Sequence, residues 1–158
     1  MVCKGYLVDT KLYKNPIPTV DAIIQRESKI LLIRRKKDPF KEMWALPGGF
    51  VNENEKVEDA VLREVREETT LEIRLLDILG VYSDPKRDPR KHIMTIVFIG
   101  EVEEDNNIKA VAADDASAIA WLDLESNDEH SFAFDHGKII NDFKKWRVCP
   151  GTFWSSKD

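Results

Sequence analysis

The sequence predicts an α+β or α/β sandwich, in which strands form a sheet and two helices pack against it. Three observations predict this fold class: paired apolar runs between residues 19 and 34, an amphipathic pattern at 56–69, and a second amphipathic pattern at 131–146. The first pattern is typical of strands and the other two of helices, so the elements can be assigned in chain order.

A β-hairpin is predicted near the start of the chain. The apolar run at 19–25 is followed by a short polar turn and then by a second run at 30–34, as in two antiparallel strands. Residues 38–44 are expected to form a loop that leads to Gly48 and Gly49. Two adjacent glycines let the backbone take a positive φ or approach a ligand closely.

The central helix is predicted at about 56–69. Val57, Ala60, Val61 and Val65 recur at helical spacing and form the stripe that we expect to be buried.

The second half of the chain alternates strands with polar connections. We expect an aliphatic strand at 71–82 with a break near Gly80, then a turn-rich loop at 83–90 with two Asp-Pro pairs, and a long strand at 92–102. An acidic connection at 103–115 leads to a short strand at 117–122 and to an amphipathic C-terminal helix at 131–146.

Composition limits the functions that the chain can have. The net charge of −5, from 24 basic and 29 acidic residues, argues against non-specific binding of nucleic acid, which needs a basic surface. There is neither a signal-peptide pattern nor an apolar run long enough to span a membrane, so we expect a cytoplasmic protein. It should form one domain over residues 1–158, with its core at about 15–147 and a tail at 148–158. Cys3 and Cys149 are isolated, which gives a zinc site little support.

Acidic side chains gather on one face of the predicted central helix. Glu64, Glu67 and Glu68 stand at i, i+3 and i+4, so their carboxylates share that face. Such like charges repel each other, and hard oxygen ligands at this density suit Mg²⁺, or Mn²⁺ in its place. The alternative is a solvated face laced with ion pairs. The glycine pair ahead of the helix favours the metal site.

The segment around this helix resembles the Nudix box, the signature of hydrolases that cleave nucleoside diphosphates linked to another moiety. The family pattern is Gly, five residues, Glu, seven residues, then Arg-Glu-aliphatic-x-Glu-Glu-x-Gly-aliphatic. The matching residues are Gly49, Glu55, Arg63, Glu64, Val65, Glu67, Glu68 and Leu71. Thr70 replaces the family's second glycine, and Asn54 stands where many relatives have glycine. Thr70 is the costlier change, about 1 kcal/mol if its φ is positive, and neither change removes a ligand.

The resemblance implies the Nudix fold, a mixed sheet between helices in an α/β/α sandwich, with the box as a loop-helix-loop at one end. It also implies that Glu64, Glu67 and Glu68 bind the metal, that Glu64 can activate the attacking water, and that Arg63 pairs with a box glutamate.

A backbone carbonyl and one side chain at the start of the box complete the candidate site. The carbonyl of Gly48 or Gly49 is expected to complete the coordination of the metal. Glu55 suits the positive end of the helix dipole, where it can accept hydrogen bonds from helix amides or from a ligand's water.

Three further segments resemble the ADP-ribose pyrophosphatase branch of the family. They are residues 15–21, 82–90 and 132–140, of which the Arg-Asp-Pro-Arg run at 87–90 is the most specific. Basic side chains from this loop could meet phosphates, although Asp-Pro pairs also form turns without binding a ligand. The candidate substrate-binding residues are Gly49, Arg34, Lys86, Arg87 and Arg90.

A water-activating base outside the box is another possibility that the resemblance raises. Asp114 and Asp115 are the candidates, with Glu103 and Glu104 as further ones, while the alternative is an acidic loop that is only solvated.

We therefore predict a Mg²⁺-dependent hydrolase of the Nudix family that cleaves ADP-ribose to AMP and ribose 5-phosphate. One alternative is a MutT-like enzyme that attacks nucleoside triphosphates. Another is a non-catalytic module that senses ADP-ribose for a partner protein. The expected substrate is a small nucleotide rather than nucleic acid or membrane, and a homodimer is possible because many relatives dimerise.

Overall fold

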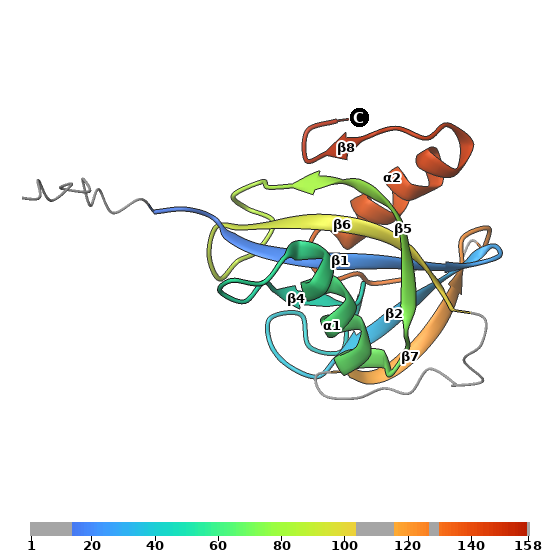
Figure 1. Cartoon of the computed structure of the whole chain (residues 1–158), viewed down its shortest axis with the longest axis horizontal. Coiled ribbons are helices and arrows are strands. Elements are labelled where there is room, and N and C mark those ends of the chain that lie inside the picture. Colours follow the sequence, from blue (N-terminus) through green and yellow to red (C-terminus); the bar gives the residue numbers. More distant parts are fainter. Residues whose placement is uncertain (1–13, 104–115, 127–129, 158) are drawn as a thin grey trace, which may run out of the picture.

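One mixed β-sheet lies between two helices (Figure 1). The computed structural model describes residues 14–103, 116–126 and 130–157. Helix α1 (Val57–Thr69) covers one face of the sheet and α2 (His136–Val148) covers the other. This arrangement is the α/β/α sandwich that the sequence predicted.

The strands fall into one path with two branches. The order across the sheet is β3-β2-β1-β6-β5-β8, with β4 paired to β1 and β7 paired to β2. The β1–β6 and β5–β8 pairs are parallel, and the remaining pairs are antiparallel. The bounds are β1 (Ile17–Arg26), β2 (Lys29–Arg35), β3 (Trp44–Ala45), β4 (Gly48–Phe50), β5 (Ile73–Tyr82), β6 (Ile93–Val102), β7 (Ala116–Asp123) and β8 (Phe153–Trp154).

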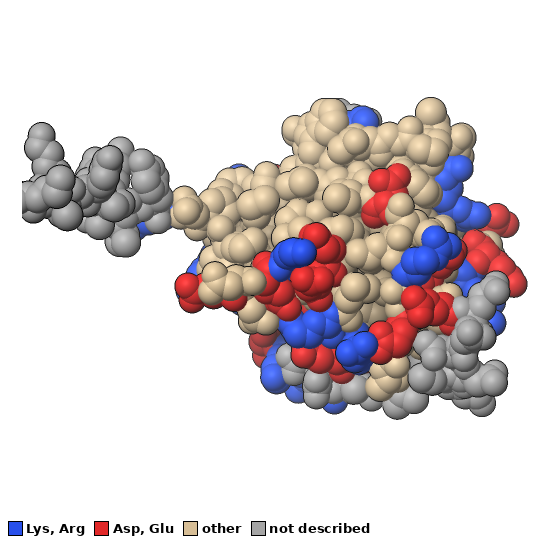
Figure 2. All heavy atoms as spheres, in the orientation of Figure 1, with Lys and Arg blue, Asp and Glu red and all other residues tan. Residues whose placement is uncertain are grey.

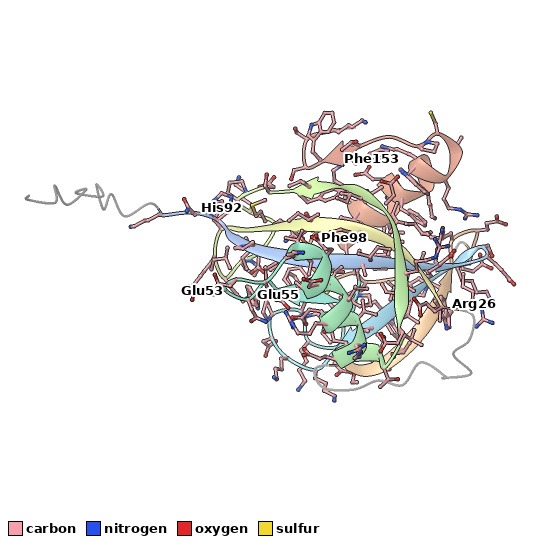
Figure 3. The ribbon with its side chains drawn as sticks, in the orientation of Figure 1. Arg26, Glu53, Glu55, His92, Phe98 and Phe153 are labelled. Atoms are coloured by element: carbon pink, nitrogen blue, oxygen red, sulfur yellow. The ribbon has the colours of Figure 1, made fainter. Side chains whose placement is uncertain are left out.

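Strand β1 is the centre of the core because both of its faces are buried. Val20, Ala22 and Ile24 pack in the cluster beneath α1, where Phe98 of β6 also lies, whereas Ile23 faces the cluster beneath α2 (Figure 3). An apolar run without polar alternation is expected of a strand covered on both sides. The hairpin predicted with β2 is confirmed.

Helix α1 confirms the predicted stripe and the predicted ending. Ala60, Val61 and Val65 are fully buried, while Val57 packs at the edge of the same cluster. The helix ends at Thr70, which takes the left-handed conformation with φ of 61° and donates its N–H to the carbonyl of Arg66. Asn54 also has a positive φ, of 64°.

The strand predicted to break near Gly80 is continuous but irregular there. Its pairing with β6 shifts register between Leu75 and Asp77 and again between Ile78 and Gly80. A Cβ on Gly80 would lie 1.9 Å from the carbonyl oxygen of Phe153, so the neighbouring strand leaves no room for a side chain.

The C-terminal segment differs from the prediction in two ways. Helix α2 begins at His136 rather than near 131, because the backbone of Ser131 and Ala133 bonds Trp44 instead of helical partners. The prediction of a tail at 148–158 is wrong for β8, which pairs with β5 and carries the buried Phe153 against α2 (Figure 3).

Two areas of the surface shown in Figure 2 differ in charge. Acidic and basic side chains intermingle over α1, whereas the area over β5 and β8 consists mostly of uncharged residues. Leu76, Ile78 and Trp154 are among the exposed apolar residues of these two strands. In the part of the chain that the structure describes, no helix is both long and apolar enough to cross a membrane.

Candidate active site

Strand β4 brings the glycine pair against the box helix. It pairs with β1 so that Gly48 lies opposite Asp21, and the Gly48 amide donates a hydrogen bond of 2.9 Å to Oε2 of Glu68. A Cβ on Gly48 would lie 2.1 Å from the carbonyl oxygen of Val20, so only glycine fits here.

The second glycine lets the backbone contact another box glutamate. A Cβ on Gly49 would lie within 2.5 Å of the carboxylate of Glu64, so a side chain at this position would displace that carboxylate. Gly49 therefore keeps Glu64 close to the strand, while Gly48 holds Glu68.

Arg63 ties the acidic side chains of the box together. Its guanidinium donates two hydrogen bonds to Glu55, of 2.7 and 2.9 Å, one of 2.7 Å to Glu64, and one of 3.2 Å to Glu67. A further bond to the carbonyl of Phe50 anchors it to β4. The predicted pairing of Arg63 with a box glutamate thus involves three glutamates, and Glu55 bonds the amide of Asn52 in the loop rather than a helix amide.

The box carboxylates have different electrostatic surroundings. Hydrogen bonds from Arg63 lower the pKa of Glu55 to about 2. Burial raises the pKa of Glu68 to about 8, with the negative charges of Glu64 and Asp21 adding to the effect and the Gly48 amide opposing it. Burial also raises the pKa of Glu64. A cation beside Glu64 and Glu68 would relieve both effects.

These residues fit a divalent cation without forming a closed cage. Among the described residues, no three His, Cys, Asp or Glu side chains converge in a ready metal-binding geometry. Glu67 is 46% exposed and paired with Arg63, which also holds Glu64. The fit rests on Glu68, a buried carboxylate with hard oxygen donors and a raised pKa beside a second carboxylate.

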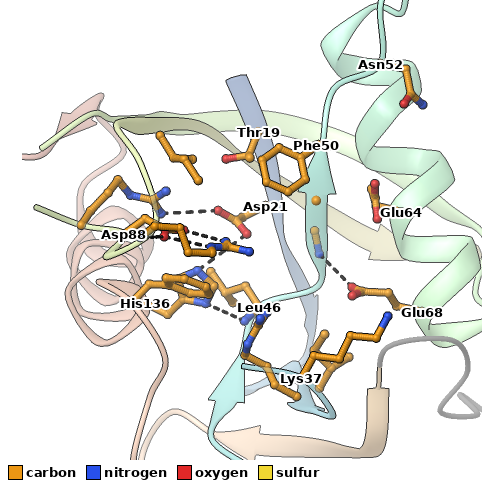
Figure 4. A pocket seen from close by; sticks show the side chains of 18 residues that line it. Thr19, Asp21, Lys37, Leu46, Phe50, Asn52, Glu64, Glu68, Asp88 and His136 are labelled. Atoms are coloured by element: carbon orange, nitrogen blue, oxygen red, sulfur yellow. Dashed lines mark hydrogen bonds and ion pairs between the residues drawn. The ribbon is translucent and has the colours of Figure 1, made fainter. Parts of the chain in front are cut away.

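A cavity of about 280 Å³ lies between the box and the rest of the sheet (Figure 4). Glu64 and Glu68 project from α1 on one side of β4, and Asp21 and His136 lie on the other. The lining residues are Thr19, Asp21, Ile33, Arg35, Lys37, Leu46, Gly48, Gly49, Phe50, Asn52, Glu64, Glu68, Arg87, Asp88, Arg90, Ile93, Phe134 and His136.

The wall opposite the box is a buried charge network. Arg87 donates two hydrogen bonds to Asp135, of 2.8 and 3.0 Å, and lies 3.8 Å from Asp21. The Thr95 hydroxyl donates to Asp21 over 2.7 Å. Arg87 is buried and paired with two aspartates, so its main role is to hold this wall of the cavity together.

Arg90 lies at the mouth of the cavity between two aromatic rings. Its guanidinium carbon is 5.7 Å from the ring centre of Phe50 and 5.6 Å from that of Phe134. Asp88 holds it through two hydrogen bonds, of 2.6 and 3.0 Å. Arg90 remains partly exposed, so it can meet an incoming anion.

The structure does not bring two predicted substrate-binding residues to the cavity. Arg34 pairs with Glu42 on the outer side, because successive residues of β2 point to opposite faces and Arg35 takes the cavity side. Lys86 is exposed in the loop, where its amide bonds Asp84, and it does not line the cavity.

Of the candidate external bases, only Glu103 lies in the part of the chain that the structure describes. Asp114, Asp115 and Glu104 lie outside the described residues. Glu103 is described, but its amide bonds the carbonyl of Glu72 at the far end of β6, away from the lining residues.

Sequence reasoning missed several residues of the cavity wall. Asp21 and His136 lay inside segments that were singled out by resemblance, yet neither was predicted as a site residue. Arg35 and Lys37 follow Arg34, which was the residue of this basic run predicted to bind substrate. Strand alternation places Arg34 and Arg35 on opposite faces of β2, but it does not tell which face meets the cavity.

Comparison with known proteins places this architecture in a family. Residues 15–143 match the model of the NUDIX domain. An ADP-ribose pyrophosphatase from Methanocaldococcus jannaschii is 50% identical over 147 residues, which cover 93% of this chain and 84% of that protein. The ADPR responsive transcriptional repressor NtrR from Acinetobacter baylyi is 30% identical over 134 residues, which cover 81% of this chain and 53% of the repressor.

A solved structure has the same fold. The NUDIX domain of Shewanella oneidensis NrtR, complexed with ADP ribose, has a TM-score of 0.72 at 28% identity and covers 89% of this chain and 93% of that chain. In this chain, too, a mixed sheet lies between two helices, with the glycine-and-glutamate box beside a polar cavity that fits a divalent cation. With these matches, the chain belongs to the NUDIX domain family, and it is a Nudix hydrolase.

Proposed function

We propose that the chain hydrolyses the diphosphate linkage of ADP-ribose and releases AMP and ribose 5-phosphate, with Mg²⁺ as cofactor and Mn²⁺ able to replace it. The observation that carries this proposal is the convergence of Glu64 and Glu68 on one cavity beside Gly48 and Gly49 of β4. The 50% identity to an ADP-ribose pyrophosphatase supports the choice of substrate.

The box residues have distinct parts in this reaction. Glu64 and Glu68, with the carbonyl of Gly48 and with Glu67 beside them, would hold the cation. A divalent ion there neutralises diphosphate oxygens and acidifies a bound water. The raised pKa of Glu64 also suits it to take a proton from the attacking water.

Arg63 is the positioning residue of the box. Because its guanidinium holds Glu55, Glu64 and Glu67 at once, it fixes the side-chain conformations on which coordination depends.

Basic side chains across the cavity would bind the substrate's phosphates. Arg90 is partly exposed at the mouth, and Arg35 and Lys37 line the same space. Phe50, which is 44% exposed beside Arg90, offers a surface on which adenine can stack.

Product identity tests the proposal. Nucleotide sugars, dinucleotides and nucleoside triphosphates are incubated with the protein and Mg²⁺ or Mn²⁺. We expect AMP and ribose 5-phosphate from ADP-ribose, with less turnover of the other substrates. Nucleoside monophosphate and pyrophosphate from triphosphates as the main products would instead assign the MutT-like alternative.

A second candidate function is sensing of ADP-ribose without catalysis, which the 30% identity to an ADPR responsive repressor favours. The intact Glu55, Arg63, Glu64, Glu67 and Glu68 support catalysis instead. Binding of ADP-ribose without any turnover in Mg²⁺ would assign the sensing role.

A cytoplasmic location and a homodimer stay predictions, which cell fractionation and analytical ultracentrifugation test.

A further inference from the structure

Two polar side chains opposite the box have no part in the proposed chemistry. His136 is 2% exposed and Asp21 is 7% exposed, and both line the cavity (Figure 4). They come from opposite ends of the chain, from the first turn of α2 and from β1. Buried polar groups that face a cavity commonly meet a ligand or an ordered water.

A backbone hydrogen bond fixes the state of the His136 ring. The buried amide of Leu46 donates to Nδ1 over 2.9 Å, so Nδ1 is the acceptor and the ring proton is on Nε2. Burial lowers the pKa of His136, in keeping with a neutral ring. The Nε2–H group is therefore a donor directed towards Asp21.

The carboxylate of Asp21 is only partly used by the protein. Its Oδ2 accepts the hydrogen bond from Thr95 and faces Arg87 at 3.8 Å. Its Oδ1 lies 3.7 Å from Nε2 of His136, too far for a direct hydrogen bond. A fixed donor and a fixed acceptor thus lie side by side without bonding each other.

The spacing of these two atoms selects the group that can bind both. One oxygen atom beside the pair, off the line that joins Nε2 and Oδ1, can lie about 2.8 Å from each, accepting from the first and donating to the second. A hydroxyl has both capacities, whereas a phosphate oxygen would repel the Asp21 carboxylate.

The position of the pair relative to the box identifies the kind of hydroxyl. A Cβ on Gly48 would lie 2.7 Å from Oδ1 of Asp21, and the amide of the same glycine holds Glu68. The pair is therefore separated from the catalytic carboxylates by a single backbone residue. In a nucleoside diphosphate sugar, the groups that directly flank the diphosphate are sugars, and the base lies further away.

We propose that His136 and Asp21 bind one sugar hydroxyl of the substrate, with His136 donating to it and Asp21 accepting from it. They act as specificity-determining residues that select a ribose beside the cleaved diphosphate. This inference rests on the proposed function, because it takes the box as the place of cleavage.

The test compares ADP-ribose with five analogues: four that each lack the 2′- or 3′-hydroxyl of one of its two riboses, and one that lacks the anomeric hydroxyl of the terminal ribose. Against the wild-type enzyme, we expect one analogue to lose on the order of 10-fold or more in kcat/KM, because the buried donor and acceptor are left unpaired. That analogue also tells whether the adenosine ribose or the terminal ribose is bound. Equal kcat/KM for all five analogues and ADP-ribose would overturn the proposal by itself.

Two variants connect the discrimination to the pair. His136→Asn can keep an acceptor for the Leu46 amide but removes the Nε2 donor, and Asp21→Asn keeps an acceptor for Thr95 but replaces the Oδ1 acceptor. In either variant, kcat/KM for ADP-ribose should fall to that of the discriminated analogue, while the analogue itself changes little. An equal loss on both substrates would mean a purely structural role and would overturn the proposal.

Separate controls distinguish a failure of this inference from misfolding of a variant and from failure of the proposed function. Thermal unfolding identifies a variant that does not fold, and either variant that folds decides the question. Lys138→Gln, on the same helix but away from the cavity, should leave the discrimination unchanged. If the wild-type enzyme does not cleave ADP-ribose, the proposed function fails. The same comparison is then made with deoxy analogues of the nucleotide that is cleaved.

Discussion

The carboxylate of Glu68 is buried beside two other acidic side chains and accepts one hydrogen bond from a backbone amide. Glu68→Gln should lower metal-dependent kcat/KM by about two orders of magnitude or more, because a ligand of the cation is lost. The glutamine carbonyl can still accept from Gly48, so the fold should remain intact and its metal-free stability should not fall. Steady-state kinetics and thermal unfolding measure both.

Glu58→Gln is the matched control, since Glu58 is an exposed residue of the first turn of the same helix. It should retain wild-type activity. Activity of Glu68→Gln within about threefold of wild type would contradict the role assigned to Glu68, because a metal ligand is worth far more.

His136 gives the fold a pH dependence of known sign. Burial holds its folded pKa below the unfolded value of about 6.5, so between the two values the unfolded chain binds more protons. The stability that the neutral His136 ring contributes is complete above pH 6.5 and is lost as the pH falls towards the folded pKa. Urea unfolding from pH 8 to pH 5 should show a smaller acid loss in His136→Asn than in wild type. Identical pH profiles would exclude the effect.

At the scale of the element, Thr70 strains the end of α1. It holds the left-handed conformation, with φ of 61°, at the position where the family has glycine. Thr70→Gly should raise the free energy of unfolding by about 0.5–1 kcal/mol, because glycine takes this conformation without a steric penalty. Chemical denaturation measures the change.

Thr69→Gly is the opposite case on the neighbouring residue. Thr69 is helical and fully buried, and its hydroxyl bonds the carbonyl of Val65, so glycine there should destabilise the fold. A loss of stability in Thr70→Gly would show that the side chain matters more than the backbone strain.

The elements that the sequence could predict are those with local signals. Apolar patterns predicted α1, β1 and β6, because a core-facing stripe recurs at helical spacing in α1 and the two strands are largely apolar runs. The two-residue β8 has no such period, and its place depends on pairing with β5 some seventy residues earlier. Short strands of this kind are decided by tertiary contacts rather than by their own sequence.

The same distinction between local signals and tertiary contacts applies to the residues of the site. The box glutamates could be predicted because one helix places them together, whereas Asp21 and His136 meet only through the folding of β1 and α2 around the cavity. The choice between Arg34 and Arg35 depended on which face of β2 meets the cavity, and no local pattern gives that in a strand buried on both sides.

At the scale of the whole molecule, the C-terminal strand closes the core beneath α2. Phe153 is 5% exposed and packs with this cluster. Phe153→Ala should lower the free energy of unfolding by about 3–4 kcal/mol, as for other buried aromatic residues. Trp154→Ala, at a half-exposed neighbour, should have a much smaller effect. Equal effects of the two substitutions on urea unfolding would mean that β8 is not part of the core.

The central claim is that the box carboxylates hold a divalent cation against the diphosphate of the substrate. A crystal structure with Mg²⁺ and a non-hydrolysable ADP-ribose analogue tests it most directly. We expect an ion bound by Glu64 and Glu68 and shared with diphosphate oxygens in the cavity. An analogue bound elsewhere, with both glutamates facing solvent and no ion beside them, would contradict it.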